Sequence, residues 1–313
     1  MRFLAFLFTV IAFMAPARAT EPLADVPFRV SSDGNILVGV MVNGHGPYEF
    51  ILDTGSTITL AFQNLSEIEH FEPTGGAPLR ILAITGAEFY DAYHMGEISI
   101  GEARLPDHTG VLVEDWEAPR QTPAGVLGLD FLTKYTLAFD VGANRVKVYE
   151  RGALPRRELS GYKKANLVAF HFANAADTLF TLRGSIRKRT VNFLIDIGSG
   201  STMLNYKAAS AVFAGTVRRT GAEGMTTGSR LKDVFDEKQA LRTALIETMR
   251  VGPVAFDNAG VWVYDAPIFK ELGVNRTSFG LFGADLILRQ NFVLDFGNEA
   301  IYFAKGGRYK SRY

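Results

Sequence analysis

The stretch FILDTGST at residues 50–57 decides the fold, because it returns as FLIDIGSG at residues 193–200. The offset between Asp53 and Asp196 is 143 residues (196 − 53). Three apolar residues precede each aspartate, so we expect each one to stand at the end of a buried strand. A repeat of this kind predicts two copies of one structural unit.

Three further segments recur in the same order in both halves of the chain. They are ISIG at 98–101 and MRVG at 249–252, GVLGLDFL at 125–132 and GLFGADLI at 280–287, and TLAFDVG at 136–142 and NFVLDFG at 291–297. With the aspartate segments they make four matched anchors. The repeated units run from Pro27 to Arg151 and from Ala165 to Lys305.

The repeat predicts the domain organisation. We expect a signal peptide at 1–19, a first lobe at 20–151, a linker at 152–164, a second lobe at 165–305 and a frayed tail at 306–313. The linker is polar and basic and contains Pro155 and Gly161, which is typical of a connection between domains.

Each unit is predicted to be mainly β, with a few short helices. Short runs rich in Val, Ile and Phe alternate with Gly and Asn turns. We expect helices at Gln63–His70 and Asn205–Phe213, and hairpin tips at Asp140–Asn144 and Asp295–Asn298. Residues 235–249 look helical by propensity, but their counterpart, residues 90–98, looks like a strand, so the repeat favours a strand.

The composition excludes several classes of partner and cofactor. The chain has 33 basic and 33 acidic residues among 313, without the basic surplus of a nucleic-acid binder. The absence of cysteine excludes thiol catalysis, thiolate zinc sites and iron–sulfur clusters. The five histidines show no i,i+4 pair, so we expect no metal and no cofactor.

The N-terminus has the pattern of a secretory signal peptide. Arg2 precedes an apolar run at residues 3–14, and Ala-Arg-Ala at 17–19 predicts cleavage after Ala19. A membrane anchor is the alternative, but the run is short for a bilayer span. We therefore expect a secreted, periplasmic protein without stable membrane insertion. Only Thr20–Val26 separates the cleavage point from the first repeated unit, so we expect no inhibitory pro-segment.

The two aspartate segments suggest a specific chemistry. Gly55 allows a sharp turn and close approach of another segment, and Ser56 is expected to donate a hydrogen bond to an ionised carboxylate. If the lobes pack around a two-fold axis, Asp53 and Asp196 meet and share one proton. A water between them can then hydrolyse a peptide bond without a metal or a covalent intermediate.

These residues resemble the pepsin and retropepsin group of aspartic peptidases. The resemblance rests on DTGS at 53–56, DIGS at 196–199, and the glycines Gly128 and Gly283, which follow the aspartates by 75 residues (128 − 53) and 87 residues (283 − 196). It covers nearly all of the mature chain and looks most like two fused retropepsin units.

The resemblance implies a bilobal acid-protease fold of two pseudo-two-fold-related, β-barrel-like lobes. It further implies a peptide or protein substrate and a monomer whose active site forms within one chain. Asp53 and Asp196 would be the catalytic residues. The residues expected to support the two turns are Thr54, Gly55, Ser56, Ile197, Gly198 and Ser199.

The same resemblance predicts a flap hairpin over the cleft. Its tip in the first lobe is expected at Ile84, Thr85, Gly86 and Ala87, and its counterpart in the second lobe at Thr226, Thr227 and Gly228. The alternative is that these glycine turns are ordinary loops.

One position departs from the family pattern. Ile197 stands where the family has Thr or Ser, whose hydroxyl ties the two catalytic turns together. Losing one hydrogen bond costs about 0.5–1.5 kcal/mol, which a large lobe interface can absorb. The two hypotheses for function are therefore an aspartic endopeptidase and a degenerate, non-hydrolytic peptide-binding protein.

Other readings of the same residues have less support. Residues 195–202, IDIGSGST, also resemble the phosphate loop of actin and sugar-kinase ATPases, which leaves an ATP-binding protein as a remote alternative. A serine hydrolase lacks its G-x-S-x-G elbow. Asp140 and Asp295 are matched acids too, but each lies just before a hairpin glycine, where a turn role is expected.

Overall fold

The computed structural model describes residues 21–115, 123–172, 174–213, 230–231, 239–240 and 242–305. Strands hold 54% of the residues and helices 12%, so the fold is mainly β as predicted. The predicted signal peptide and tail lie outside the described residues. Among the described residues, no helix is long and apolar enough to cross a membrane.

The first lobe is a closed six-stranded barrel. Its strands follow the order β2-β3-β10-β4-β9-β8, and β8 pairs back onto β2 to close the ring. The bounds are β2 Ile36–Val42, β3 His45–Leu52, β10 Gly125–Leu127, β4 Leu60–Phe62, β9 Ala103–Val113 and β8 Ala92–Ile100. The short strand β5 (Glu72–Pro73) adds to β8 at the outside.

The second lobe repeats this barrel strand for strand. Its order is β15-β16-β22-β17-β21-β20, closed by the pairing of β20 with β15, and β14 (Val168–Phe172) adds to β15. The bounds are β15 Asn174–Ile186, β16 Arg189–Ile195, β22 Phe279–Phe282, β17 Met203–Leu204, β21 Val254–Val263 and β20 Arg242–Val251. In each lobe the strand before the aspartate pairs in parallel with the strand before the later glycine. The repeat in sequence is thus a repeat in structure.

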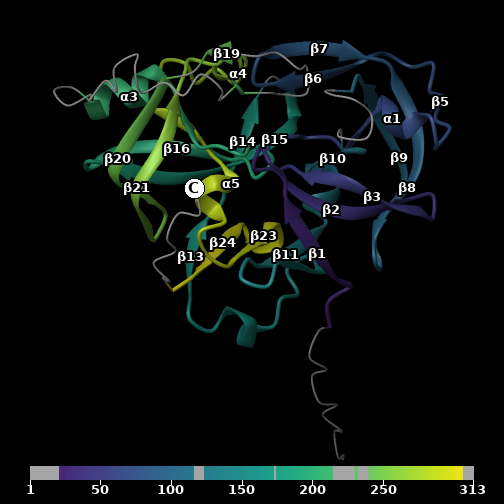
Figure 1. Ribbon diagram of the computed structural model, residues 1–313, viewed down its shortest axis with the longest axis horizontal. Helices are drawn as coiled ribbons and strands as arrows, with labels where there is room; N and C mark the ends of the chain where they lie inside the picture. Colours follow the sequence, from purple (N-terminus) through teal and green to yellow (C-terminus); the bar gives the residue numbers. More distant parts are fainter. Residues whose placement is uncertain are drawn as a thin grey trace, which may run out of the picture.

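An antiparallel sheet with strands from both halves joins the two barrels. Its order is β13-β24-β23-β11-β12-β1, and it lies below the two lobes in Figure 1. The bounds are β13 Tyr162–Asn166, β24 Ala300–Ala304, β23 Phe292–Asp295, β11 Tyr135–Asp140, β12 Arg145–Glu150 and β1 Ala24–Val30. The pairing of β11 with β23 links the lobes, and there Phe139 stacks on Phe292 with ring centroids 4.3 Å apart.

The stretch predicted as a linker, residues 152–164, is partly regular. A 3-10 helix, η1, covers Arg156–Leu159, and β13 begins at Tyr162. The strand begins there because Tyr162–Asn166 pairs with β24 along its whole length.

The helices are short. They are α1 Gln63–Ser66, α2 Leu129–Leu132, α3 Tyr206–Phe213, α4 Pro267–Glu271, α5 Ala284–Ile287 and the 3-10 helix η2 Phe296–Asn298. The helix predicted at Asn205–Phe213 is confirmed, whereas the one predicted at Gln63–His70 ends early, at Ser66. Both predicted hairpin tips are confirmed, since β11 and β12 flank one and β23 and β24 the other.

The strand favoured by the repeat over residues 235–249 is confirmed for the part that β20 covers. There Arg242–Val251 pairs with β21 along almost its entire length. Helical propensity is a weak preference, and closing the barrel outweighs it. Gly101 and Gly252 turn the matched hairpins with φ of 57° and 54°.

Two small hairpins stand outside the barrels. In the first, β6 (Leu79–Ala83) pairs with β7 (Gly86–Tyr90), and Figure 1 shows it running across the top of the first lobe toward α4. In the second, β18 (Arg230–Leu231) pairs with β19 (Gln239–Ala240).

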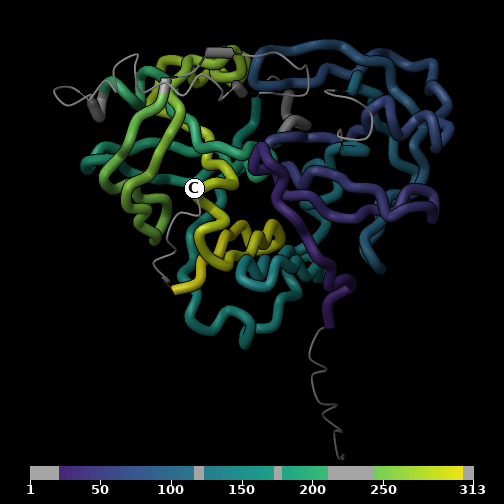
Figure 2. The backbone as a smooth tube through the Cα atoms, in the orientation of Figure 1, coloured from purple at the N-terminus to yellow at the C-terminus, as the bar shows by residue number. Residues whose placement is uncertain are grey.

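One apolar core runs through both lobes. A single cluster of buried side chains contains Leu52 and Leu127 from the first barrel together with Ile195 and Phe282 from the second. The backbone trace in Figure 2 shows the two barrels side by side around this region. Leu52 and Ile195 end the strands that lead into the two aspartate turns, and Leu127 and Phe282 end the strands paired with them, so the core fixes where the turns begin.

Candidate active site

The two aspartates follow directly on buried parallel strands. Asp53 comes after β3, and its backbone N–H donates to Leu127 O at 3.0 Å. Asp196 comes after β16, and its N–H donates to Phe282 O at 3.1 Å. Each aspartate is therefore anchored to the strand that precedes the later glycine of its own lobe.

The glycines of the two turns let the aspartates approach each other. A Cβ placed on Gly55 would lie 2.9 Å from Cγ of Asp196, and one on Gly198 would lie 2.2 Å from Cγ of Asp53. Real Cβ atoms do not approach other atoms so closely, so only glycine fits at both positions. Each turn thus faces the aspartate of the other lobe, and the two carboxyl groups hydrogen-bond to one another.

Backbone amides orient both carboxylates. The Gly55 N–H donates to Oδ1 of Asp53 at 2.7 Å, and the Ser199 N–H donates to Oδ1 of Asp196 at 2.9 Å. The turn geometry aims these N–H groups at the carboxylate that begins the turn. The aspartates are therefore held in place by the backbone of the D-x-G-S turns.

The role expected of the serine hydroxyl is wrong. Ser56 Oγ donates to Ile58 O at 2.7 Å rather than to Asp53, and Ser199 Oγ donates to Ser201 O at 2.9 Å. Because the turn is sharp, the carbonyl of the residue two positions after each serine lies within hydrogen-bonding distance of the serine hydroxyl. The carboxylates already accept hydrogen bonds from backbone N–H groups. Both serines therefore brace their own loops.

Burial changes the acidity of both aspartates. Burial raises the pKa of Asp53, opposed by the Gly55 N–H that bonds its ionised form. Burial and the negative charge of Asp53 together raise the pKa of Asp196 well above its usual range. Two carboxyl groups in contact cannot both ionise easily. The pair therefore holds one shared proton.

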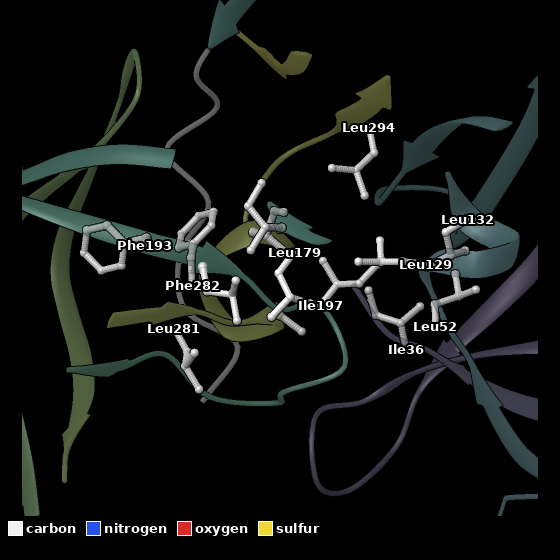
Figure 3. Close-up of a cluster of buried hydrophobic side chains, with 14 of the residues drawn as sticks. Ile36, Leu52, Leu129, Leu132, Leu179, Phe193, Ile197, Leu281, Phe282 and Leu294 are labelled. Carbon is white, nitrogen blue, oxygen red and sulfur yellow. The ribbon is translucent and has the colours of Figure 1, made fainter. Parts of the chain in front are cut away.

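One hydroxyl ties the two turns together across the lobe boundary. Thr54 Oγ1 donates to Ile195 O at 2.8 Å and accepts from Ile197 N–H at 3.1 Å, and the threonine is 1% exposed. Ile197 is at the same position of the second turn, but it has no hydroxyl and therefore cannot make the equivalent hydrogen bonds to the first turn, as the sequence indicated. Its side chain instead packs against apolar residues of both lobes; Figure 3 shows it beside Ile36, Leu129 and Leu179.

The β6–β7 hairpin crosses from the first lobe to the second. The predicted tip residues Ile84, Thr85, Gly86 and Ala87 form the turn and the first part of β7, and all are partly exposed. Ile84 O accepts from Ile268 N–H of α4 at 3.2 Å, and Arg80 forms an ion pair with Glu271 of the same helix. The counterpart residues Thr226, Thr227 and Gly228 lie outside the described residues.

A contact that sequence reasoning missed lies behind the second turn. The loop between β1 and β2 packs on it so closely that a Cβ on Gly34 would lie 2.9 Å from Gly200 Cα. A Cβ on Gly200 would lie 1.8 Å from Asp33 O. The composition Asp-Gly-Asn at 33–35 marks a turn, but no local signal says which distant segment that turn meets.

The matched acids outside the site have structural roles. Asp140 Oδ1 accepts from Ala143 N–H at 3.2 Å, and Asp295 Oδ1 accepts from Asn298 N–H at 3.1 Å, so each stabilises its own hairpin turn. Among the described residues, no group of three or more His, Asp or Glu side chains is arranged to hold a metal ion. His45 and His108 instead hydrogen-bond to Glu69 and to Thr59 O.

Comparison with known families agrees with this geometry. Residues 38–131 match the aspartyl protease family model. This match covers most of the first lobe. It runs from β2 into α2, so it includes Asp53 and the β6–β7 hairpin, and it supports a peptidase-like function. No curated protein matches the chain.

The second barrel is the structural counterpart of the matched region. It has the same strand order and places a second aspartate turn against the first, which gives the bilobal, mainly β fold predicted from the sequence.

Residues 195–202 also resemble a phosphate loop in sequence. That loop needs alternating strands and helices, whereas in the described structure the segment leaves a strand of a closed β-barrel.

Proposed function

We propose that the protein is an aspartic endopeptidase that hydrolyses peptide bonds with a water held between Asp53 and Asp196. One observation carries this proposal: each catalytic turn places its glycine against the aspartate of the other lobe, at positions where a Cβ would lie 2.9 Å and 2.2 Å from the opposing Cγ atoms. That arrangement brings together two carboxyl groups with one proton between them.

The mechanism follows from the proton that the pair shares. The ionised carboxylate accepts a proton from the water as the water oxygen bonds to the carbonyl carbon of the scissile peptide, and the protonated carboxyl group donates a hydrogen bond to the carbonyl oxygen. As the tetrahedral intermediate collapses, the C–N bond breaks, and the leaving nitrogen takes up the proton that the first carboxylate accepted from the water. Products are a carboxyl and an amino terminus.

The substrate class follows from the hairpin that spans the lobes. Because β6–β7 contacts α4 of the second lobe, a chain bound over the aspartates would lie beneath a bridge between the barrels. An extended peptide suits that space, since it presents its backbone to both lobes. We propose that the protein is a monomer, because both turns come from one chain. We also propose that it is exported, because its N-terminus has the pattern of a signal peptide that ends at Ala19.

The test compares wild type, Asp53→Asn and Asp196→Asn on a mixed peptide library from acid to neutral pH. We expect cleavage by wild type and a loss of at least about 1,000-fold in both variants, because each removes one half of the acid–base pair. Asp140→Asn is the matched control, since Asp140 serves a turn in the same repeat. Equal cleavage by all four proteins would refute the catalytic assignment.

A non-hydrolytic peptide-binding protein is the second candidate, and Ile197 favours it. The isoleucine removes one of two possible hydroxyl tethers between the turns. This candidate predicts no cleavage by wild type, together with binding of a peptide whose scissile amide is replaced by a hydroxyethylene group. Calorimetry with that peptide, run beside the cleavage assay, separates the two functions.

A further inference from the structure

Two buried threonines occupy the same place in the two lobes. Thr59 and Thr202 each lie six residues beyond the aspartate of their own turn (59 − 53 and 202 − 196), and both are 0% exposed. Each hydroxyl accepts from the N–H of the later glycine, Gly128 at 3.0 Å and Gly283 at 3.1 Å. Each therefore joins the end of a catalytic loop to the glycine segment of its lobe.

Each threonine hydroxyl also donates to an acid. Thr59 Oγ1 donates to Asp130 Oδ1 at 2.7 Å, and Thr202 Oγ1 donates to Asp285 Oδ1 at 2.6 Å. Both acids lie two residues beyond the glycine, as the second residue of α2 and of α5. A hydrogen bond to an ionised acceptor is short and about twice as strong as a neutral one.

The acids also accept from the backbone on both sides of the junction. Asp130 accepts from Thr59 N–H at 3.0 Å and from Phe131 N–H at 2.9 Å. Asp285 accepts in the same way from the N–H groups of Thr202 and Leu286. One carboxyl group in each lobe therefore links the catalytic loop to the helix that follows the glycine.

The junction has no spare room. A Cβ on Gly128 would lie 2.4 Å from Ile58 O, and one on Gly283 would lie 2.5 Å from the carbonyl carbon of Ser201. The loop and the glycine segment are thus in direct contact, and a small shift of one moves the other. Each aspartate N–H donates to the carbonyl of the residue directly before that glycine, Leu127 in the first lobe and Phe282 in the second.

We propose that Thr59–Asp130 and Thr202–Asp285 are positioning pairs, one in each lobe, that hold Asp53 and Asp196 at the separation required for the shared proton. The proposal rests on the proposed peptidase function. It assigns to these four side chains an effect on the rate of the chemical step, beyond a contribution to folding.

The test uses Thr202→Val, which removes the hydroxyl and keeps the shape, and Thr202→Ser, which keeps the hydroxyl. We expect kcat to fall by at least about tenfold in the valine variant with KM changed by less than about twofold, and the serine variant to recover most of the loss. The rate is expressed per active site, titrated with a tight-binding hydroxyethylene peptide. A role in folding alone would lower the titrated fraction and leave kcat per site unchanged, which would overturn the proposal.

A second readout does not depend on cleavage. We expect amide hydrogen exchange at residues 196–199 to be at least about tenfold faster in Thr202→Val than in Thr202→Ser, since the turn loses its support. If wild type cleaves no peptide, the proposed function fails while this comparison still tests the positioning role. Equal exchange in the two variants would overturn it. If Thr202→Val does not fold, Thr59→Val and Thr59→Ser give the same comparison at residues 53–56.

Discussion

Thr54 and Ile197 occupy the same position of the repeat and hold the lobes together in different ways. Thr54 contributes two hydrogen bonds to the backbone of the opposite turn, whereas Ile197 contributes apolar packing at 0% exposure. The interface therefore keeps one polar tether and replaces the other by burial of a branched side chain. A site that is pseudo-symmetric in its backbone is asymmetric in its side chains.

Replacing Thr54 by valine tests the polar tether. We expect the free energy of unfolding to fall by about 1–3 kcal/mol, because Ile197 N–H and Ile195 O would be left buried without their partner. Urea denaturation measures this change. The control is Thr248→Val at an exposed threonine, and a loss no larger than that of the control would contradict the tether.

Asp285 makes stability depend on pH. Burial raises its pKa from 3.8 to about 6, so the folded state binds this proton more tightly than the unfolded state. The free energy of unfolding contributed by this group is therefore highest below pH 4 and is lost as pH rises toward and through about 6.

We expect Asp285→Asn to remove that loss, because asparagine does not titrate. The free energy of unfolding of the variant should therefore rise relative to that of wild type between pH 4 and pH 7. The shift is at most about 3 kcal/mol. Urea denaturation of both proteins at four pH values measures it. Parallel stability curves for the two proteins would contradict the assignment.

At the scale of elements, the β6–β7 hairpin is one part of the first lobe that reaches the second. Its contacts with α4 include one backbone hydrogen bond and the ion pair between Arg80 and Glu271, whose side chains are both partly exposed. An exposed ion pair contributes only about 0–1 kcal/mol, so it can hold the hairpin against α4 without locking it there.

Reversing the charge at Arg80 tests this contact. We expect Arg80→Glu to raise KM by about two- to fivefold with kcat little changed and stability unaffected, because the pair is partly exposed. The double variant Arg80→Glu with Glu271→Arg is expected to restore KM. Failure of the second charge reversal to restore KM would show that the hairpin is held by other contacts.

At the scale of the whole molecule, packing between distant loops decides the geometry of the second turn. The backbone of Gly200 touches the β1–β2 loop, and a Cβ there would lie 1.8 Å from Asp33 O. The antiparallel pairing of β11 with β23 also joins the two lobes. Both contacts join segments more than 100 residues apart.

We expect Gly200→Ala to lower the free energy of unfolding by about 1–3 kcal/mol and to lower kcat, because the loop and the turn must separate to admit the methyl group. Gly260→Ala is the matched control, since nothing lies within 4 Å of a Cβ there. Thermal unfolding and peptide cleavage of the two variants measure the difference. Equal behaviour of the two variants would contradict the close packing.

The sequence by itself determined the duplicated unit, the strand that leads into each aspartate and the turn that follows it. These features are local, since three apolar residues before Asp-x-Gly-Ser specify a buried strand and a sharp turn, and the repeat identifies both copies. The repeat predicts a strand over residues 235–249 in the same way, against their helical propensity, and β20 confirms it from Arg242 onward.

Only the tertiary structure decided how the two units meet. It set the sheet between the lobes, the strand that begins inside the predicted linker, and the direction of the hydroxyls of Ser56 and Ser199. The contact of Gly34 with Gly200 was likewise decided by the tertiary structure. These outcomes depend on which surfaces fit and which hydrogen-bonding groups lie within reach after folding, and periodicity along the chain carries no information about either.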